Sequence, residues 1–419
     1  MFHVHLLNFV YGNEFMPTTS PKSQHVLVLN CGSSSLKFAI IDANTGHEII
    51  SGLAERLGAT TPSIKYKFNG AKTVINLVSG QAHAEAIDTL VSLIKDHSLD
   101  EQLIAVGHRV VHGGEHFTQS VLIDEKVIAG ITQAATLAPL HGHANLLGIA
   151  SAQASFEGLP QIAVFDTAFH QTMNEVVYLY ALPYKLYTEF GVRRYGFHGT
   201  SHFYVAGQTA KLLNQPIEQS NFISAHLGNG CSVCAIKNGK SVDTSMGLTP
   251  LEGLMMGTRS GDIDPGLFNF LTTQLDYTAQ QIDNLLNQKS GLLGISELSN
   301  DCRTIEEAAV AGNKKAILAL DMFCYRLSKQ IAAYMVPLQR LDAIIFTGGI
   351  GENSDIIREK VISQLAFLGL DCDQQANLNA RFGQEGIISS SQARSKAVVM
   401  PTNEEWVIAL DAANIAKEL

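Results

Sequence analysis

Two arginines stand in segments that are otherwise apolar or rich in glycine. Arg109 lies in GHRVVHGG at the end of a strand-like run, and Arg259 lies in GLMMGTRSGDIDPG. A charge in such surroundings is costly unless it is paired or used, and a lone buried arginine is usually an ion-pair partner. Two of them suit the bidentate recognition of carboxylate or phosphate. The sequence therefore indicates a site for an anionic substrate.

Acidic residues occupy two further positions that suit chemistry. Asp166 ends the strand-like run QIAVFD, where α/β proteins place catalytic or metal-directing acids, although a helix N-cap is the alternative. Glu404 and Glu405 open the expected final helix, which Thr402 or Asn403 would cap. The helix dipole explains one acid there but does not require both.

Histidines and cysteines also recur at short spacing. His108, His112 and His116 are four residues apart, which would make a metal face on a helix, but the VV and GG between them argue against a helix. Cys231 and Cys234 form a C-x-x-C in a strand-like segment, where positions three apart point to opposite faces. Neither set favours a metal site.

Three histidines lie in segments that we expect to be turns. His141 and His143 belong to PLHGHAN, and His198 belongs to RRYGFHGTSH. A turn histidine is often only solvated. His198, between Phe197 and Gly199, is placed to donate a hydrogen bond rather than to fill a core.

Glycine-rich turns follow several buried runs. VLVLNCGSSSLKFAI (26–40) reads as strand, turn and strand, and its turn is either an ordinary hairpin loop or a grip for an anion. GSSSLKFAI at 32–40 can be aligned with GNGCSVCAI at 228–236, an offset of about one domain. A third turn, FTGGIGENS at 346–354, resembles a nucleotide-contacting loop. The repetition predicts a duplicated architecture with a nucleotide cleft.

The elements that must position these residues alternate in type. Strand-like runs such as AVGHRVV and AIIFTGG alternate with helical ones such as HAEAIDTLVSLIKDH, which predicts α/β domains. The chain has 419 residues, 46% of them hydrophobic, a net charge of −10 and no apolar run long enough for a membrane helix. We therefore expect a cytoplasmic protein that binds neither nucleic acid nor membrane. Six scattered cysteines suit a reducing compartment.

Taken together, the motifs resemble the acetate kinases, within the superfamily of acetate and sugar kinases, heat-shock-protein ATPases and actin. The resemblance runs from about residue 25 to the C-terminus. NCGSSSLKFAI and RYGFHGTSH resemble the two signatures of the family. Further segments occur in the family's order: GHRVVHGG, VFDTAFH, HLGNG, GLTPLEGLMMGTRSGDIDPG, FTGGIGENS and PTNEE.

The resemblance implies a duplicated actin-like (ribonuclease H-like) two-domain α/β ATPase fold with a central cleft. The expected division is an extension (1–24), an N-terminal domain (25–166 plus 404–419) and a nucleotide-binding domain (167–403). The implied reaction is reversible phosphoryl transfer from ATP to acetate, which gives ADP and acetyl phosphate with Mg²⁺, or Mn²⁺ in its place. A homodimer is also implied.

The resemblance assigns roles residue by residue. Asn30 and Glu404 match the magnesium site, and Asp166 matches the catalytic aspartate. His198 and Arg259 match the transition-state stabilisers, and His141 matches a supporting histidine. The acetate site corresponds to Arg109, Val111, Leu140, Phe197 and Pro250. The ATP site corresponds to Ser33, Ser35, Lys37, His226, Leu227, Gly228, Asn229, Gly230, Asp301, Cys302, Arg303, Gly349, Ile350, Gly351, Glu352 and Asn353.

The sequence departs from the family pattern at several of these positions. Cys31 replaces an alanine, Gly142-His143 replaces Asn-Pro beside the acetate pocket, and Cys302 replaces a phenylalanine near the adenosine. These changes leave acid choice and nucleotide preference open. The nearest rival is a propionate or other short-chain acyl kinase, because one methyl group is worth only about 1 to 3 kcal/mol of discrimination. A non-catalytic actin-like ATP-binding module is the distant alternative.

Overall fold

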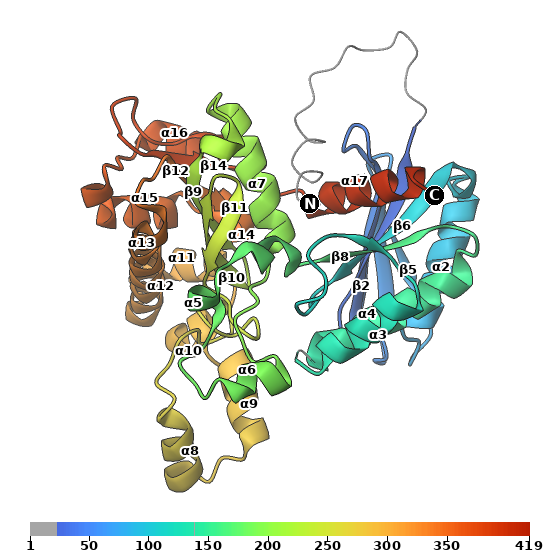
Figure 1. The fold of residues 1–419 in the computed structure, drawn as a ribbon, viewed down its shortest axis with the longest axis horizontal. Coiled ribbons are helices and arrows are strands. Elements are labelled where there is room, and N and C mark those ends of the chain that lie inside the picture. Colours follow the sequence, from blue (N-terminus) through green and yellow to red (C-terminus); the bar gives the residue numbers. More distant parts are fainter. Residues whose placement is uncertain (1–22, 138) are drawn as a thin grey trace.

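The structure is a computed structural model that describes residues 23–137 and 139–419, the side chains of residues 139–141 excepted. Its described residues form two α/β lobes, each built around one sheet (Figure 1). The first lobe is drawn at the right of Figure 1 and the second at the left. Among the described residues, no helix has both the length and the apolar character needed to span a bilayer.

The sheet of the first lobe has eight strands in the order β5-β4-β3-β2-β1-β6-β8-β7. Strands β1 and β2 form an antiparallel hairpin, and β1, β6 and β8 run parallel. The strands are β1 (His25–Cys31), β2 (Ser35–Asp42), β3 (Glu48–Glu55), β4 (Ser63–Phe68), β5 (Ala71–Asn76), β6 (Leu103–Val110), β7 (Val121–Leu122) and β8 (Gln161–Phe165). The helices are α2 (His83–Asp96), α3 (Glu125–Ala135), α4 (Pro139–Ser155) and α17 (Glu404–Lys417).

The alternation of side chains along β1 explains how two layers of helices cover this sheet. Leu27 and Leu29 point to one face and pack in a core with α2 and α4. Val26 and Val28 point to the other face, where Ile408 and other side chains of α17 cover them. The buried pattern of β1 is therefore continuous, as expected for a strand with helices on both sides.

The sheet of the second lobe has six strands in the order β11-β10-β9-β12-β14-β13. Helix α7 packs on one face of it and α12 on the other. The strands are β9 (Asn221–Leu227), β10 (Cys231–Lys237), β11 (Lys240–Thr244), β12 (Ala343–Thr347), β13 (Gly386–Ile387) and β14 (Lys396–Val399). The helices are α5 (Glu175–Tyr178), α6 (Lys185–Phe190), α7 (Gly199–Leu212), α8 (Leu267–Leu275), α9 (Ala279–Gln288), α10 (Gly291–Ser296), α11 (Cys302–Val310), α12 (Lys314–Ala333), α13 (Met335–Leu338), α14 (Gly348–Asn353), α15 (Asp355–Gln364) and α16 (Gln374–Asn379).

The two sheets share one topology, so the predicted duplication is confirmed. The order β3-β2-β1-β6-β8 in the first lobe corresponds to β11-β10-β9-β12-β14 in the second. In both, the first two pairings are antiparallel and the last two are parallel. The aligned segments 32–40 and 228–236 therefore occupy equivalent hairpins.

Several local predictions are confirmed. Asn403 caps α17, since its Oδ1 accepts a hydrogen bond from the backbone N–H of Trp406 at 3.0 Å. Asp166 follows β8 and is not the cap of the short helical turn after it, because Thr167 holds that position. Cys231 and Cys234 lie on the buried strand β10.

Two local predictions are wrong. The sequence predicts a turn around His141 and His143, but the chain is helical there from Pro139 onward as α4. Gly142 lies so close to α3 that an added Cβ would stand 2.3 Å from the Cβ of Ala135, so glycine permits the close packing of these helices. The expected loop at 346–354 is also largely helical, as α14.

One acid of α17 makes the stability of the fold dependent on pH. The Oδ2 of Asp411 accepts a hydrogen bond from the Oγ of Ser120 at 2.5 Å. Burial raises the pKa of Asp411 to about 6, and the bond from Ser120 only partly opposes this. The pKa of Asp411 is higher in the folded than in the unfolded protein, so folding is favoured while this carboxyl is protonated. The contribution of Asp411 to the free energy of unfolding is therefore complete below about pH 4 and is lost as the pH rises through about 6.

We expect Asp411→Asn to stabilise the fold at pH 8 by about 1 to 2 kcal/mol, because it removes a poorly solvated charge and keeps an oxygen acceptor. Urea unfolding at pH 5 and pH 8 measures this, and the gain should be larger at pH 8. The exposed Asp88→Asn on α2 is the control and should change stability little. An Asp411→Asn variant that is less stable at pH 8 would contradict this account.

Candidate active site

The first cluster of functional side chains forms where β6 and β8 end. These strands are parallel and pair Val110 with Phe165, so Arg109 and Asp166 emerge side by side. The guanidinium makes a bidentate contact, from Nε to Oδ1 at 2.9 Å and from Nη2 to Oδ2 at 2.7 Å. Glu404, the first residue of α17, brings its Oε2 to 3.8 Å from the Nε of Arg109. One cation therefore lies against two carboxylates from distant parts of the chain.

The electrostatics of this cluster leave negative charge in excess. Burial disfavours the charged guanidinium, but Asp166 and then Glu404 outweigh this effect and raise the pKa of Arg109. Burial raises the pKa of Glu404, and repulsion by Asp166 and Glu405 adds to the rise while Arg109 opposes it. A further cation beside Asp166 and Glu404 would relieve the repulsion between them.

The hairpin of β1 and β2 supplies the next residues. Asn30 at the end of β1 is paired in register with Lys37 of β2. The Nζ of Lys37 forms an ion pair with the Oε1 of Glu405, and this contact lowers the pKa of Glu405 although burial would raise it. Ser33 in the turn is exposed and Ser35 is partly buried. The hairpin thus places Lys37 next to an acid that opens α17, and it carries two serines at its turn.

Asn145 of α4 holds the ends of β1 and β6 together, a role that no motif of the sequence indicates. Its buried side chain accepts from the N–H of Val111 at 3.0 Å and donates to the carbonyls of Cys31 and Arg109, each at 3.2 Å. An asparagine within the apolar run ANLLGIA is the only sequence signal for it. Asn145 fixes the backbone directly after Arg109, on either side of Val110, and ties it to the end of β1.

The second cluster forms around the turn between β9 and β10. A Cβ added to Gly230 would stand 3.3 Å from the Nη1 of Arg259, 3.6 Å from the Cε1 of His198 and 3.7 Å from its Nε2. Arg259 also donates from Nη1 to the carbonyl of Pro250 at 3.1 Å. The glycine turn therefore lets a guanidinium and an imidazole approach each other without a side chain between them.

His198 has an unusual backbone. It is the N-cap residue of α7 and has φ at 58°, in the left-handed region that few residues other than glycine adopt. Its ring stacks on that of His226, with 4.2 Å between centroids. Burial, with the neighbouring His226 and Arg109, lowers the pKa of His198 well below its usual value. His198 is therefore neutral near pH 7.

The two clusters adjoin each other. The N–H of Gly199, directly after His198, donates to the carbonyl of Asp166 at 2.9 Å. Arg109 also lies close enough to contribute to the lowered pKa of His226, after burial. The predicted residues Arg109, Asp166, His198 and Arg259 are thus brought into one region by elements of both lobes.

The residues expected around the nucleotide are tied together by short contacts. The Oε1 of Glu352 accepts from the N–H of Gly348 at 2.9 Å and from that of Thr402 at 3.2 Å, so it links α14 to the segment before α17. Asn353 donates to the carbonyl of Gly349 at 2.9 Å. Gly349 is exposed, with no atom within 4 Å of an added Cβ.

Three other predicted nucleotide residues open α11. Asp301 caps this helix by accepting from the N–H of Arg303 at 2.8 Å. Cys302 is buried, whereas the side chain of Arg303 is exposed and pairs with Glu307 on the same helix. Asn229 on the nearby turn accepts from the side chain of Asn300 at 3.0 Å.

The expected apolar pocket is described only in part. Phe197 is buried and forms a T-shaped pair with His112, 5.6 Å between ring centroids, and Val111 is partly buried against the core of the second lobe. The side chains of Leu140 and His141 lie outside the described residues.

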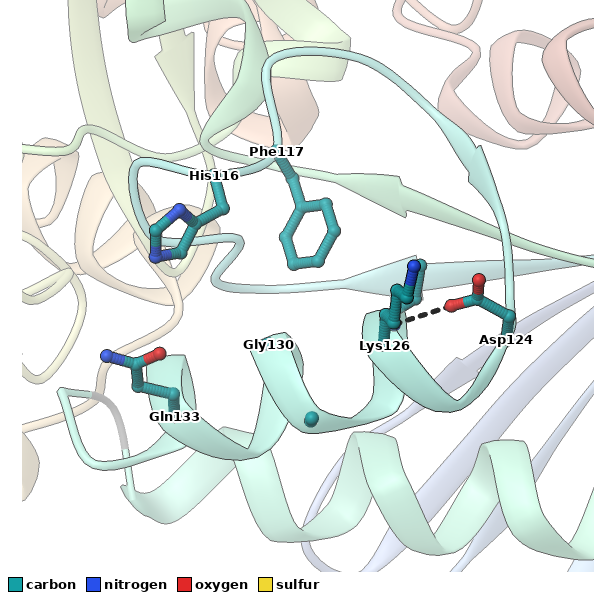
Figure 2. Close-up of a pocket in the computed structure, with 8 residues that line it drawn as sticks. His116, Phe117, Asp124, Lys126, Gly130 and Gln133 are labelled. Carbon is teal, nitrogen blue, oxygen red and sulfur yellow. Dashed lines mark hydrogen bonds between the residues drawn. The ribbon is translucent and has the colours of Figure 1, made fainter.

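One surface cavity of the described chain lies away from these clusters. It has a volume of about 560 Å³ beside α3 and is lined by residues such as His116, Phe117 and Gln133 (Figure 2). The dashed contact of Asp124 in Figure 2 is the N-cap of α3, where its Oδ1 accepts from the N–H of Val127 at 2.8 Å. The cavity therefore has an ordinary helix start at its edge and does not include Arg109 or Arg259.

Comparison with known proteins decides the family. The model of the acetokinase family matches residues 25–410. The chain belongs to the acetokinase family. The match begins at residue 25, where the resemblance is predicted to begin, and ends at residue 410, nine residues before the predicted end at the C-terminus.

Relatives of the acetokinase family are similar in sequence and in structure. The chain is 61% identical to an acetate kinase of Shewanella sp. (strain ANA-3) over 92% of this chain and 97% of that protein. A propionate kinase from Francisella tularensis has a TM-score of 0.90 at 45% identity, covering 94% of this chain and all of the other. The acetate kinase of Porphyromonas gingivalis gives 0.89 at 45% identity with the same coverage. The duplicated α/β architecture is therefore that of the acetokinase family.

We expect Asn145→Ala to destabilise the protein, because the N–H of Val111 and two buried carbonyls lose their partner. Each unsatisfied buried group costs about 1 to 3 kcal/mol, so the total loss should exceed about 2 kcal/mol. Chemical unfolding measures it, with Gln153→Ala on the same helix as a control that should cost less than about 0.5 kcal/mol. Equal stability of the two variants would show that water replaces the contacts of Asn145.

Proposed function

We propose that the protein is an acetate kinase that transfers a phosphoryl group reversibly between ATP and acetate, giving ADP and acetyl phosphate. The observation that carries the proposal is the approach of His198 and Arg259 across Gly230, beside the pair of Arg109 and Asp166. Phosphoryl transfer needs in-line positioning and donors around the equatorial oxygens rather than covalent help from the protein. This set of residues suits that requirement, and the curated relatives named acetate kinase support it.

The acids of the first cluster fit a divalent cation. Asp166, Glu404 and Asn30 offer the oxygen donors that Mg²⁺ prefers, and Mn²⁺ accepts the same donors. The raised pKa of Glu404 reflects burial and repulsion by Asp166, which a cation would offset. Among the described residues there is no group of three or more His, Cys, Asp or Glu able to hold a metal, so the remaining ligands would be water and phosphate oxygens. When bound, Mg²⁺ neutralises charge on the phosphates.

The protein's own residues would divide the remaining work. Arg109 presents two donors that match a carboxylate, and release from Asp166 would free them for acetate. An acetate carboxylate is already ionised near pH 7, so Asp166 has no proton to remove and would orient the metal or its water. His198 as a neutral donor and Arg259 as a cation would stabilise the transferring group. The methyl group would lie among Val111, Leu140, Phe197 and Pro250, with His141 in support.

The ATP side of the reaction would use the two equivalent hairpins. Lys37 with Ser33 and Ser35 on the first hairpin, and His226 to Gly230 on the second, offer cationic and N–H donors for phosphate oxygens. Two segments then border the adenosine, which are Asp301 to Arg303 and Gly349 to Asn353. The exposed surface of Gly349 is consistent with a base lying against it.

We also propose the domain division, the location and the oligomeric state expected from the family. Residues 25–166 plus 404–419 would form one domain and 167–403 the other, supported by the packing of α17 on β1 and β6. The location would be the cytoplasm. A homodimer is supported by partly exposed apolar side chains on α8, namely Leu267, Phe268, Phe270 and Leu275.

A propionate kinase is the second candidate. A solved propionate kinase has the same fold at 45% identity. Such an enzyme would share nearly every catalytic residue, so the volume of the methyl site would decide between the two acids. A non-catalytic ATP-binding module is disfavoured because it would need no carboxylate pocket, and so no Arg109 in addition to the Arg259 and His198 that meet at the turn of Gly230.

We expect ADP release to depend on both a short-chain acid and Mg²⁺, with acetate preferred. A coupled assay with acetate, propionate and butyrate at equal concentrations, with and without Mg²⁺, measures this. A higher kcat/KM for propionate than for acetate would move the assignment to the second candidate. ATP hydrolysis that needs no carboxylate, as the only activity, would overturn the kinase proposal.

We expect Arg259→Ala to lower kcat by about 10³ to 10⁵-fold if Arg259 acts as an arginine finger does, a loss of about 4 to 7 kcal/mol. The fold should remain, and thermal unfolding checks it. Arg340→Ala, which removes an exposed arginine paired with Asp342, is the control and should keep kcat. Turnover within tenfold of the parent would remove Arg259 from the mechanism.

A further inference from the structure

A chain of hydrogen bonds runs from the interior of the second sheet to His198. The Nδ1 of His198 lies 2.9 Å from the Oγ of Ser232, and the same Oγ lies 2.8 Å from the Nε2 of His202. The Nδ1 of His202 lies 2.9 Å from the Oγ of Ser224. Ser224, Ser232 and His202 are fully buried. The sequence motifs alone assign no role to any of these three residues.

Ser224, at the buried end of this series of hydrogen bonds, determines which atom donates in each of them. The hydroxyl of Ser224 has one hydrogen-bond partner within the described residues, the Nδ1 of His202. A buried hydroxyl proton without an acceptor costs about 1 to 3 kcal/mol, so Ser224 donates to His202. His202 must then accept at Nδ1 and carry its own proton on Nε2.

The same reasoning assigns the protons of the remaining hydrogen bonds, from His202 to His198. The Nε2–H of His202 donates to the Oγ of Ser232, which occupies one lone pair of that oxygen. Ser232 has one proton, and its remaining partner is the Nδ1 of His198. Ser232 therefore donates to Nδ1, and neutral His198 carries its proton on Nε2.

The other end of this series of hydrogen bonds is the Nε2 of His198, which lies beside Gly230, where phosphoryl transfer is proposed. The Nε2 of His198 stands 3.7 Å from the position of a Cβ on Gly230, on the side that faces the Nη1 of Arg259. No hydrogen bond to this Nε2 is formed within residues 23–137 and 139–419. It is therefore free to donate to an oxygen between His198 and Arg259.

This assignment of protons requires His198 and His202 to be neutral, and the surroundings of both rings favour that state. Burial, followed by His226 and Arg109, lowers the pKa of His198, with His202 and Arg259 adding to the effect. Burial, followed by His170 and His226, lowers the pKa of His202. Both rings stay neutral at the pH of the reaction, so each has one donor and one acceptor nitrogen.

We propose that Ser232 is a positioning residue that, with His202 and Ser224, holds the proton of His198 on Nε2, ready to donate to the transferring phosphoryl group. The catalytic consequence rests on the proposed function, whereas the proton order on His198 does not. Without this relay of hydrogen bonds through Ser224, His202 and Ser232, the Nδ1 of His198 loses its donor, and the tautomer with the proton on Nδ1 becomes accessible. That tautomer has no donor toward Gly230.

The test measures the tautomer and the rate separately. In ¹⁵N-histidine spectra of the whole protein, His198 should show an unprotonated Nδ1 and a protonated Nε2, assigned by loss of its signals in His198→Gln. Ser232→Ala should give a mixture of tautomers. Its kcat should fall at least tenfold with KM for acetate within about threefold, which is less than the loss of about 10² to 10³-fold expected for removing a donor outright. Ser232→Thr keeps the hydroxyl and should restore both.

Two variants guard against a merely structural effect. Ser224→Ala changes the relay one step further from the site and should shift the tautomer of His202 while lowering kcat by a smaller factor. Ser241→Ala removes a hydroxyl from another buried histidine, His170, at 2.8 Å, and should leave the His198 signals unchanged. Thermal unfolding of each variant identifies loss of fold.

The possible results are distinct. A native tautomer in Ser232→Ala, or a protonated Nδ1 in the parent protein, would overturn the proposal. A changed tautomer with an unchanged kcat would also overturn it, because the relay would then have no catalytic effect. Absence of acetate kinase activity in the parent, together with the expected spectra, would instead refute the proposed function and leave the proton order intact.

Discussion

The bidentate pair of Arg109 and Asp166 is the contact around which the rest of the site is organised. It joins the ends of two parallel strands, and it places one cation among carboxylates that would otherwise repel each other. Glu404 can join this group only because α17 returns to the first sheet and packs over β6. Asn145 then fixes the backbone directly after Arg109, on either side of Val110. The geometry of the acids thus depends on a few polar contacts at one sheet edge.

Duplication of the fold provides the other half of the arrangement. Each lobe contributes a hairpin from the centre of its sheet, and the two hairpins differ in what they carry. The first carries Lys37 beside an acid, whereas the second carries a glycine turn between His198 and Arg259. A symmetric scaffold therefore supports an asymmetric site, with the acids Asp166, Glu404 and Glu405 on the side of the first hairpin and the donors His198 and Arg259 on the side of the second. The acetokinase family model covers residues 25–410 and so spans both hairpins.

The sequence predicts more of the fold than of the connections within the site. Buried runs such as QIAVF and the paired hairpins are local patterns, so β8 and both turns can be expected from the residues alone. The helix that begins at Pro139 cannot, because Gly142 is a poor helix former whose value lies in its contact with Ala135 of α3.

The family motifs identify candidate residues but not the residues that hold them in place, such as Asn145 and Ser232. Their roles depend on strand register and on partners up to 114 residues away, which no short motif encodes. Arg109 illustrates the difference: its type and surroundings mark it as functional in the sequence, but its pairing with Asp166 emerges only when β6 and β8 align.

The return of α17 to the first sheet has a consequence for the order in which the protein can fold during synthesis. Val26, Val28 and Val164 belong to an apolar face that, among the described residues, is covered by α17, and α17 follows the second lobe in the chain. While residues 167–403 are being made, this face stays open to water and to other chains, a condition that invites aggregation or chaperone binding. The docking of α17 also brings Glu404 to the site. Until α17 has left the ribosome, one face of the first sheet therefore stays uncovered and the cluster of acids lacks Glu404.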